Sequence, residues 1–390
     1  MLARSLAGDP PAALPPELLE ESCAPALFSI VVEGLADRFE PALCDIYVRL
    51  FSQAIAETAG ECEAAALEAR YHRVRRARAV TGEPATVFVV SRVTLGADVA
   101  ITSVLLDAAK RRFPRARMVF VGPPKNYELF AGDSRLEHAS VSYQRGGLGS
   151  RLAVWNELRA LFDSADTLVL DPDSRLTQLG LLPVCPEERY RLFESRAYGS
   201  RSRDREGAMS DASLPELAAA WANETLQVDG ARPYLALGAP APPQGITVSL
   251  GVGENPAKRL ADPFEEKLLS LVAATGLPIT IDKGAGGEEA ARVENACRRA
   301  GVRATFWDGS FAGFAALIAG SRLYVGYDSA GQHVAAAAGV PLISIFAGFP
   351  VSRMFERWRP TTPSAHVIRV DNPDVEGALE RVREALRAAL

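Results

Sequence analysis

The chain has 390 residues, of which 48% are hydrophobic and 23% are charged, and its formal net charge is −5 at pH 7. This composition is ordinary for a globular protein, and the acidic balance argues against nucleic acid as a partner. No apolar run is long enough to span a membrane, so we predict no transmembrane helix. The five cysteines form no CxxC pair, and their odd number favours a reduced cytoplasmic protein over a disulfide scaffold.

Residues 1–82 are predicted to form a helical extension. Apolar residues between 43 and 55 recur at the spacing of an amphipathic helix, and residues 17–35 and 62–78 have a similar texture. The third helix ends in a basic run over residues 70–78, which is either a solvated helix face or a contact for anionic lipid headgroups. We predict that the extension either self-associates or touches the inner face of an anionic membrane.

Residues 83–237 are predicted to form a first α/β lobe. Apolar runs of strand length alternate with segments of helical spacing, which is typical of a doubly wound parallel sheet. A polar segment rich in Gly, Ser and Arg, residues 196–207, is predicted to be a mobile loop. The expected strands are 86–91, 117–121, 141–143 and 167–171, and the expected helices are 99–112, 149–163 and 214–226.

Residues 245–372 are predicted to form a second lobe of the same kind, after a proline-rich linker at 238–245 and before a final helix at 373–390. Two similar α/β halves joined by such a linker indicate two Rossmann-like lobes that face a cleft. The expected strands are 246–250, 278–282, 304–306, 323–325, 341–346 and 366–370, and the expected helices are 263–274, 287–300 and 311–319, with one more beginning at 328 or 329.

The turn after residues 323–325 carries the most specific pattern in the chain. Asp328 and Ser329 are both good N-cap residues, so a helix is expected to begin there. Ala330 and Gly331 are small, which would let a ligand approach the unpaired N–H groups of the first turn. Those groups suit a phosphate or diphosphate. An ordinary capped helix, with His333 one turn further on as a satisfied side chain, explains the same residues.

The string Asp-Ser-Ala-Gly-Gln-His at 328–333, with the Ala-Ala-Ala-Ala-Gly-Val-Pro that ends at Pro341, resembles a family signature. The signature is the Asp-Thr-Gly-x-x-His…Ala-Ala-x-Gly-x-Pro of the ADP-heptose:lipopolysaccharide heptosyltransferases, glycosyltransferase family nine. Ser329 replaces Thr and Ala330 replaces Gly. The resemblance covers residues 85–385 and implies the GT-B fold. It also implies inverting transfer of a sugar, with heptose preferred, from an ADP-heptose-like nucleotide-sugar donor to a saccharide or glycolipid hydroxyl.

The loop after the first strand, Leu95-Gly-Ala-Asp-Val-Ala-Ile-Thr-Ser103, resembles the family's Leu-Gly-Asp-Val-x-x-Thr-x-Pro stretch. The resemblance assigns Asp98 the role of general base, which would take the proton of the acceptor hydroxyl as it attacks the anomeric carbon. One extra residue, Ala97, stands between the glycine and the aspartate. The alternative is that Asp98 only caps the following helix.

Two further segments resemble donor-binding parts of the family. Lys258 follows a glycine-rich loop and would contact the donor phosphates, where a cation offsets the charge of the leaving diphosphate. Its alternative is a solvated surface residue. Glu288 or Glu289 would hold the ribose hydroxyls, and Glu288 aligns better. Their alternative is a pair of first-turn acids favoured by the helix dipole.

No cofactor or metal is expected. The Asp171-Pro-Asp173 string matches the metal-binding pattern of another glycosyltransferase fold, but GT-B enzymes use the helix dipole and cations for this work. Two other function classes stay open. One is a GT-B transferase with another sugar donor or a protein acceptor. The other is a catalytically silent protein that binds a nucleotide sugar.

Overall fold

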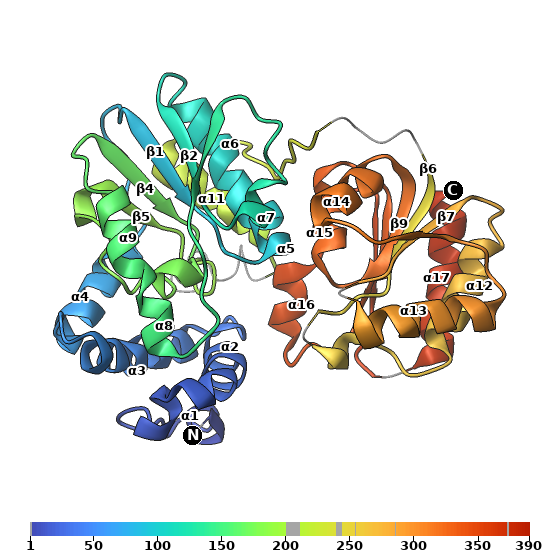
Figure 1. Ribbon diagram of the computed structural model, residues 1–390, viewed down its shortest axis with the longest axis horizontal. Helices are drawn as coiled ribbons and strands as arrows, with labels where there is room; N and C mark the ends of the chain where they lie inside the picture. Colours follow the sequence, from blue (N-terminus) through green and yellow to red (C-terminus); the bar gives the residue numbers. More distant parts are fainter. Residues whose placement is uncertain (1, 200–210, 239–243, 254, 285, 373) are drawn as a thin grey trace. The chain divides into compact units, whose positions relative to one another are not determined.

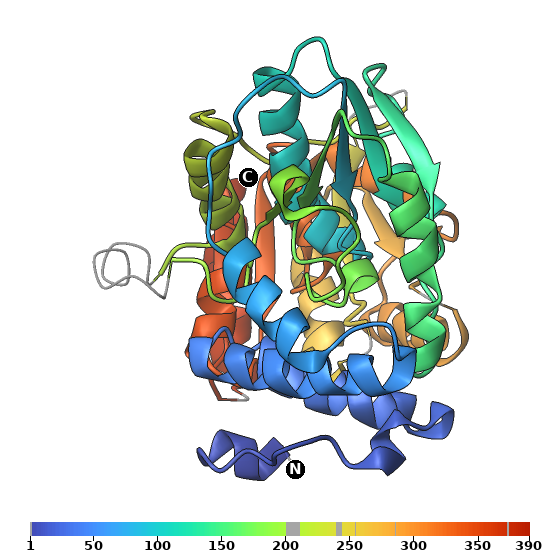
Figure 2. The same ribbon diagram turned by 90° about the vertical axis from the view of Figure 1, so that its left-hand side faces the viewer.

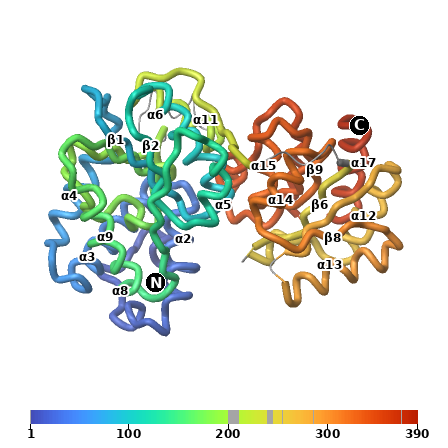
Figure 3. Tube along the Cα trace, turned by 45° about the horizontal axis from the view of Figure 1, so that its top comes forward, coloured from blue at the N-terminus to red at the C-terminus, as the bar shows by residue number. Residues whose placement is uncertain are grey.

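The structure, a computed structural model, describes residues 2–199, 211–238, 244–253, 255–284, 286–372 and 374–390. Contacts within the chain divide it into two compact units. Unit 1 comprises the residues up to Tyr127 together with Ser134–Pro233, and unit 2 comprises Glu128–Asp133 together with Tyr234–Leu390. Figure 3 traces the chain through both units. The short segment Glu128–Asp133 therefore belongs to unit 2, although both of its neighbours along the chain belong to unit 1.

Unit 1 is built on a parallel sheet with the strand order β3-β2-β1-β4-β5 (Figure 1). Residues 87–90 and 118–121 are all buried, as expected for central strands of a parallel sheet that is covered on both faces. The strands are β1 (Thr86–Val90), β2 (Arg117–Gly122), β3 (Leu136–Ser140), β4 (Thr167–Asp171) and β5 (Tyr190–Leu192).

Three parts of unit 1 differ from the sequence prediction. The third strand is β3 rather than 141–143, because at this sheet edge only Leu136 of the strand is buried and the apolar signal is weak. The strand β5 was not predicted. The predicted helix at 99–112 begins earlier, at Leu95, and includes a π-helical turn. Residues 200–207 of the predicted mobile loop lie outside the described residues. The helices are α5 (Leu95–Ala97), the π-helical turn (Asp98–Thr102), α6 (Ser103–Arg112), α7 (Pro124–Tyr127), α8 (Leu148–Leu152), α9 (Val154–Leu161) and α11 (Leu214–Leu226).

The N-terminal helices share the core of this sheet. Phe28 and Phe51 belong to one continuous apolar cluster with Phe88 of β1 and Val119 of β2. Figures 1 and 2 show α2, α3 and α4 gathered along one end of unit 1. Residues 1–82 are therefore packed as part of unit 1, where the sequence suggested a separate extension. Their main elements are α1 (Leu2–Leu6), a π-helical segment (Ala26–Val32), α2 (Glu33–Ala36), α3 (Pro41–Ala59) and α4 (Ala64–Val74), with 3-10 turns at Pro16–Leu19 and Glu21–Cys23.

The basic run at residues 70–78 is only partly the solvated helix face that the sequence suggested, because Arg73, Arg76 and Arg78 are exposed whereas Arg70 is buried. The Arg70 side chain is buried, donates to the carbonyl oxygen of Gly180 at 3.0 Å, and lies 4.8 Å from the centre of the Tyr190 ring. Arg73 forms an ion pair with Glu187 at 2.7 Å. The run therefore attaches α4 to the segments that precede and include β5.

Unit 2 is built on a second parallel sheet, with the order β11-β10-β9-β6-β7-β8. Its apolar cluster joins residues of these strands, such as Val248 and Val325, to residues of the flanking helices, such as Phe264 and Val382. The strands are β6 (Gln244–Ser249), β7 (Ile279–Asp282), β8 (Thr305–Trp307), β9 (Ser321–Tyr327), β10 (Leu342–Phe346) and β11 (Ala365–Arg369). The helices are α12 (Phe264–Ala273), α13 (Gly287–Ala300), α14 (Phe311–Ala319), α15 (Ala330–Ala337), α16 (Ser352–Trp358) and α17 (Val375–Ala389), with a 3-10 turn at Pro256–Lys258.

Several helices begin and end at residues with a clear local cause. Ser213 forms a reciprocal capping box with Glu216 at the start of α11, and the Ser310 hydroxyl accepts from the first turn of α14. Gly60 and Gly301 end α3 and α13 in the left-handed conformation, which glycine adopts without strain.

Each sheet has a point where the strand order reverses beside its first strand. In unit 1 this switch point lies between β1 and β4, and in unit 2 it lies between β6 and β9. Ligands of doubly wound sheets bind outside the carboxyl ends of the strands at such points. Within the described ranges, none of the helices combines the length and apolar character that crossing a membrane requires.

Candidate functional site

The switch point of unit 2 brings Lys258 and Asp328 together. Lys258 ends the 3-10 turn that follows β6, and Asn255 fixes this turn by accepting from the main-chain N–H of Ala257 at 3.0 Å. The Lys258 Nζ atom lies 2.6 Å from Asp328 Oδ2 and 3.3 Å from the Asp328 carbonyl oxygen. The lysine side chain keeps 19% exposure while the carboxylate keeps 5%. The Lys258 side chain therefore stays partly accessible to solvent, while the carboxylate that it pairs with is covered.

Asp328 is held from its other side by Gln332, which the sequence reading did not single out. The Gln332 amide donates to Asp328 Oδ1, and its own Oε1 accepts from the Ser344 hydroxyl at 2.5 Å. Gln332 and Ser344 are fully buried. Gln332 and Ser344 therefore hold the Asp328 carboxylate in place.

His333 is a packed, neutral side chain in this arrangement. Its ring meets the Trp358 ring edge-on, with 5.6 Å between centroids, and it is 8% exposed. Burial lowers the pKa of His333 to about 4; the charge of Asp328 acts against this shift and that of Lys258 adds to it. The ring therefore carries no charge at neutral pH. It can support the turn at 328–331, but it does not supply a cation for phosphate.

The start of α15 lies where the sequence predicts it, with Ser329 as the N-cap residue. The Ser329 hydroxyl makes no capping bond and lies 3.5 Å from the Tyr324 hydroxyl. Gly331 has a packing role that the sequence did not suggest, because a Cβ at this position would collide with the buried Tyr324 ring. Ala330 is partly exposed. A large side chain at 331 would thus disturb the packing on Tyr324 whether or not a ligand binds there.

The structure favours Glu289 over Glu288 as the acidic side chain near this edge. A Cβ on Gly284 would collide with the Glu289 carboxylate, and one on Gly251 would lie 3.0 Å from Glu289 Oε1. The carboxylate therefore reaches the loops that follow β6 and β7. Glu288 is exposed and lines a shallow hollow of about 360 Å³ among the charged residues of α12 and α13, including Arg292. The helical phase of α13 thus directs the two side chains to different surroundings, and the choice between Glu288 and Glu289 stays a prediction.

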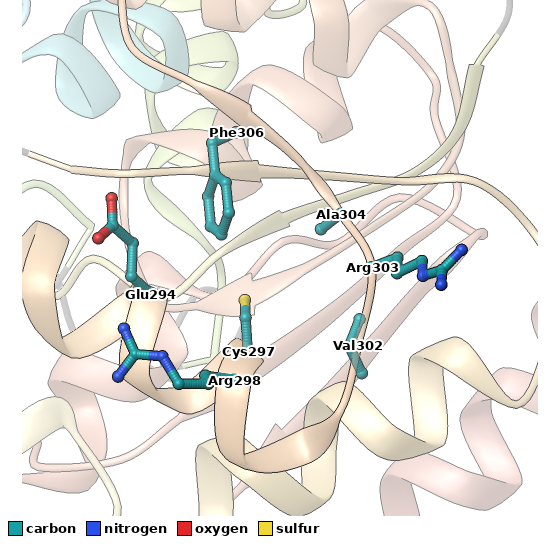
Figure 4. A pocket seen from close by; sticks show the side chains of 7 residues that line it. All are labelled: Glu294, Cys297, Arg298, Val302, Arg303, Ala304 and Phe306. Atoms are coloured by element: carbon teal, nitrogen blue, oxygen red, sulfur yellow. The ribbon is translucent and has the colours of Figure 1, made fainter.

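A second hollow, of about 410 Å³, lies at the other end of α13 (Figure 4). It is lined by Glu294, Cys297 and Arg298 of this helix and by Phe306 of the edge strand β8. The figure shows the Phe306 ring above the Cys297 thiol, with Arg298 and Glu294 at one side. None of the predicted site residues lines this hollow, so it is separate from the switch point.

Asp98 of unit 1 is fully buried in a cage of donors. Its two carboxylate oxygens accept four hydrogen bonds of 2.6–2.7 Å, which come from Ser91 Oγ, the main-chain N–H of Arg92, Thr102 Oγ1 and Asn126 Nδ2. Burial raises the pKa of the Asp98 carboxyl above its ordinary value, and the hydrogen bonds act in the opposite direction. Asn126, in α7 after β2, was not predicted as a site residue.

This cage defines how Asp98 could take a proton. All four bonds occupy lone pairs of the carboxylate, so a substrate hydroxyl can reach it only after one donor turns away. The hydroxyls of Ser91 and Thr102 can rotate, whereas the main-chain N–H of Arg92 cannot. The extra residue Ala97 comes directly before the π-helical turn at Asp98–Thr102, which accommodates a wider helical turn at this point. Asp98 lies inside the continuous helical stretch that begins after its N-cap residue Thr94, so it does not cap the helix.

The carboxylates of the Asp171-Pro-Asp173 string are both engaged by the protein. Asp171 accepts from Ser174 N at 2.7 Å and from the hydroxyls of Thr177 and Tyr190, while Asp173 pairs with Arg196. No group of three or more potential metal ligands occurs among the residues that the structure describes. The string therefore serves the packing of unit 1.

Comparisons with known proteins bear on the family and the fold. The family model described as Glycosyltransferase family 9 (heptosyltransferase) matches residues 267–382. No curated protein sequence matches the chain significantly. The family match confirms the resemblance drawn from the sequence and the glycosyltransferase class.

Solved structures with the same fold confirm the GT-B architecture. The glycosyl transferase family 9 protein from Veillonella parvula DSM 2008 is 14% identical, with a TM-score of 0.58 over 80% of this chain and 99% of its own. The E. coli ADP-heptose lps heptosyltransferase II is 20% identical, with a TM-score of 0.55 over 78% and 98%. The E. coli heptosyltransferase WaaC with ADP-2-deoxy-2-fluoro heptose is 14% identical, with a TM-score of 0.56 over 78% and 100%.

Proposed function

We propose that the protein transfers a heptose from an ADP-heptose-like donor to a saccharide hydroxyl, because residues 267–382 match the glycosyltransferase family 9 model. The observation that carries the proposal is the Lys258–Asp328 pair beside the start of α15, at the switch point of unit 2. A cation and a helix N-terminus at one point suit a diphosphate. The donor of the E. coli WaaC structure, an ADP-heptose analogue, supports the choice of sugar and nucleotide.

Each donor group has a residue of matching chemistry. The diphosphate would lie on the N–H groups at 329–331, and Lys258 would turn from Asp328 to a phosphate oxygen. The Glu289 carboxylate, between the loops after β6 and β7, would accept hydrogen bonds from the two ribose hydroxyls. Gln332 would keep Asp328 in place while Lys258 moves. No residue in this set requires a metal, because the helix start and Lys258 supply the positive potential.

The transfer would be a single displacement with inversion. The acceptor oxygen forms a bond to the anomeric carbon as the bond from that carbon to the phosphate oxygen breaks. The nucleoside diphosphate leaves with the bonding electrons, and Lys258 and the start of α15 stabilise its charge. Asp98 takes the proton of the acceptor hydroxyl after one cage donor has turned away. A carboxyl whose pKa is raised by burial is a better proton acceptor for this step.

One observation favours a second candidate function. The four bonds to Asp98 leave it no vacant lone pair, which is also what a nucleotide-sugar-binding protein without transfer activity would show. A GT-B transferase for another sugar or for a protein acceptor uses the same donor groups. A membrane contact of the basic run at residues 70–78 stays a prediction: Arg73 and Arg78 donate to the carboxylate and the carbonyl oxygen of Glu187, but both residues are exposed.

A donor panel tests the proposal. Purified protein would be incubated with ADP-heptose, UDP-glucose, GDP-mannose and dTDP-rhamnose, each with a heptose-free lipopolysaccharide core acceptor, and nucleoside diphosphate release would be measured. We expect turnover of ADP-heptose at least tenfold above the others, and a product whose anomeric configuration is opposite to that of the donor. Equal rates for all donors, or preference for another sugar, would contradict the heptose assignment. Binding of ADP without release from any donor would support the silent protein.

A further inference from the structure

Three buried charged side chains lie at the carboxyl ends of β1, β4 and β5 in unit 1. Arg92, Asp173 and Arg196 are 8%, 1% and 5% exposed, respectively. Asp173 Oδ2 pairs with Arg196 Nη1, lies 3.7 Å from Arg92 Nη1, and accepts from the Ser195 hydroxyl at 2.9 Å. Such a set of buried charges is stable only while every member keeps its partners. The function proposed above does not use any of these three residues.

Arg92, one member of this buried set, contacts Asp98 directly. The Arg92 side chain is anchored by two hydrogen bonds of 2.7 Å, to the carbonyl oxygen of Pro172 and to Ser195 Oγ. Its main-chain N–H donates directly to Asp98 Oδ1 at 2.7 Å. The same residue therefore joins the buried charges to the carboxylate that is proposed as the base.

The turn that Arg92 anchors is strained. Val93, the next residue, has a φ of +70°, which a β-branched side chain rarely adopts. A residue in this conformation persists only where its surroundings hold it there. Its N–H is bound to the Ser91 hydroxyl at 2.8 Å, and that hydroxyl donates to Asp98. The turn at 91–93 thus supplies two of the four donors to Asp98.

Arg196, another member of the set, contacts the N-terminal helices. Arg196 Nε lies 3.2 Å from Asp37 Oδ1, and Asp37 is the residue that ends α2. The Asp37 side chain is 29% exposed. A continuous series of contacts therefore runs from the end of α2 through Arg196, Asp173 and Arg92 to Asp98.

We propose that Arg92 is a positioning residue for Asp98, and that Asp37 keeps Arg92 in place through Arg196 and Asp173. The N-terminal helices would then be part of the machinery that sets the candidate base, and not an appendage to it. This inference rests on the proposed role of Asp98. It concerns residues that lie outside the segment matched to the family.

Variants at two positions of the whole chain test this inference, and the variant at Arg92 has a conservative partner. Asp37→Asn removes the charge at a partly exposed position, so the protein is expected to fold. Arg92→Met removes the inner anchor, and Arg92→Lys restores part of it. The control is Arg73→Ala, which breaks another contact between the N-terminal helices and the rest of unit 1, the 2.7 Å pair with Glu187, but leaves the series intact. The readouts are amide hydrogen exchange at residues 92 and 93 and steady-state transfer from ADP-heptose.

We expect Asp37→Asn to speed amide exchange at 92 and 93 at least tenfold and to lower kcat about tenfold, with the donor KM within twofold of wild type. Arg92→Met is expected to lower kcat about a hundredfold, Arg92→Lys to recover part of it, and Arg73→Ala to change neither readout. Exchange at 92 and 93 that stays at the wild-type rate in Asp37→Asn and Arg92→Met would overturn the inference. If the wild type transfers no sugar, the proposed function fails, yet the exchange rates still decide whether this series holds the turn.

Discussion

Glu288 and Glu289 differ in what they can contact, although they are neighbours in the first turn of α13. Glu289 reaches the loops after β6 and β7, whereas Glu288 faces the outer surface of α12 and α13. We therefore expect Glu289→Gln to weaken ADP binding by about tenfold to a hundredfold, since charge-assisted hydrogen bonds contribute roughly 1.5–3 kcal/mol. Isothermal calorimetry with ADP measures the loss.

Glu288→Gln is the matched control, because it makes the same chemical change one residue away. Its ADP affinity is expected to stay within twofold of wild type. If Glu288→Gln loses affinity and Glu289→Gln does not, the ribose lies on the other side of α13, and the choice made from the sequence was right.

Lys258 pairs with Asp328 beside the start of α15, and its loss would act in two ways. Lys258→Ala would remove the proposed phosphate contact and leave the Asp328 carboxylate without this ion pair. We expect ADP affinity to fall by about tenfold to a hundredfold, the range of about 1.5–3 kcal/mol for one charge-assisted contact. Lys267→Ala, which removes an exposed partner of Glu376, is the control and is expected to change nothing.

Repeating the ADP titrations of wild type and Lys258→Ala with EDTA tests whether Lys258 and the start of α15 bind the diphosphate without a divalent metal. We expect wild-type affinity for ADP to be the same with and without the chelator. Binding that EDTA abolishes, or binding that survives in Lys258→Ala, would place the phosphate site elsewhere.

At the scale of an element, His333 of α15 makes the stability of unit 2 depend on pH. Its folded pKa, about 4, lies below the ordinary value of 6.5, so the unfolded chain binds a proton that the folded chain refuses. The free energy of unfolding therefore has its full value above pH 6.5, where His333 is unprotonated in both states. It decreases as the pH falls towards 4, because the unfolded chain gains a proton. The difference corresponds to about 3 kcal/mol for a fully buried group. We therefore expect unit 2 to lose stability between pH 7 and pH 4.5.

His333→Gln separates this effect from other titrations. Urea denaturation followed by amide hydrogen exchange in β9 and β10, at pH 7 and at pH 4.5, gives the loss of stability of unit 2 for each protein. The loss is expected to be smaller in the variant by about 2 kcal/mol, because the buried imidazole is gone. An equal loss in both proteins would mean that His333 is protonated in the folded state.

Elements with strong local signals were predictable from the sequence. The bounds of α11, α13 and α14 agree with the expected ranges, because serine caps or a terminal glycine accompany each helical pattern. The edge strand β3 was misplaced, since only Leu136 of its five residues is buried. Local pattern does not tell which of two apolar segments pairs with the sheet.

The candidate site was partly predictable for a related reason. Lys258 and Asp328 lie in the turns where motif spacing put them, and the structure joins them at 2.6 Å. Gln332 and Asn126 carry no signal of their own, because an amide matters here only through the carboxylate that it contacts. The packing of Gly331 on Tyr324 likewise depends on a residue seven positions earlier, on the preceding strand.

For the whole molecule, the two units differ in how their apolar clusters are built from the sequence. The apolar cluster of unit 2 is built from residues 246–386 alone. The cluster of unit 1 runs without interruption from the N-terminal helices into the sheet, so residues 1–82 and the sheet are expected to unfold together. Amphipathic helices predict a buried face, but the sequence does not say which surface covers that face.

Phe51→Ala tests this cooperativity directly. Phe51 lies on α3, is fully buried, and stacks on Tyr47 with 4.5 Å between ring centroids. Removing a buried phenyl ring costs about 3–5 kcal/mol. If α3 shares one core with the sheet, the whole of this cost is expected to appear as faster hydrogen exchange in β1 and β2. Exchange in β6 and β9 is expected to stay unchanged. Phe264→Ala, an equally buried ring in unit 2, is the matched control and is expected to give the reverse pattern. If hydrogen exchange in β1 and β2 is unchanged in Phe51→Ala, the N-terminal helices fold as a separate extension.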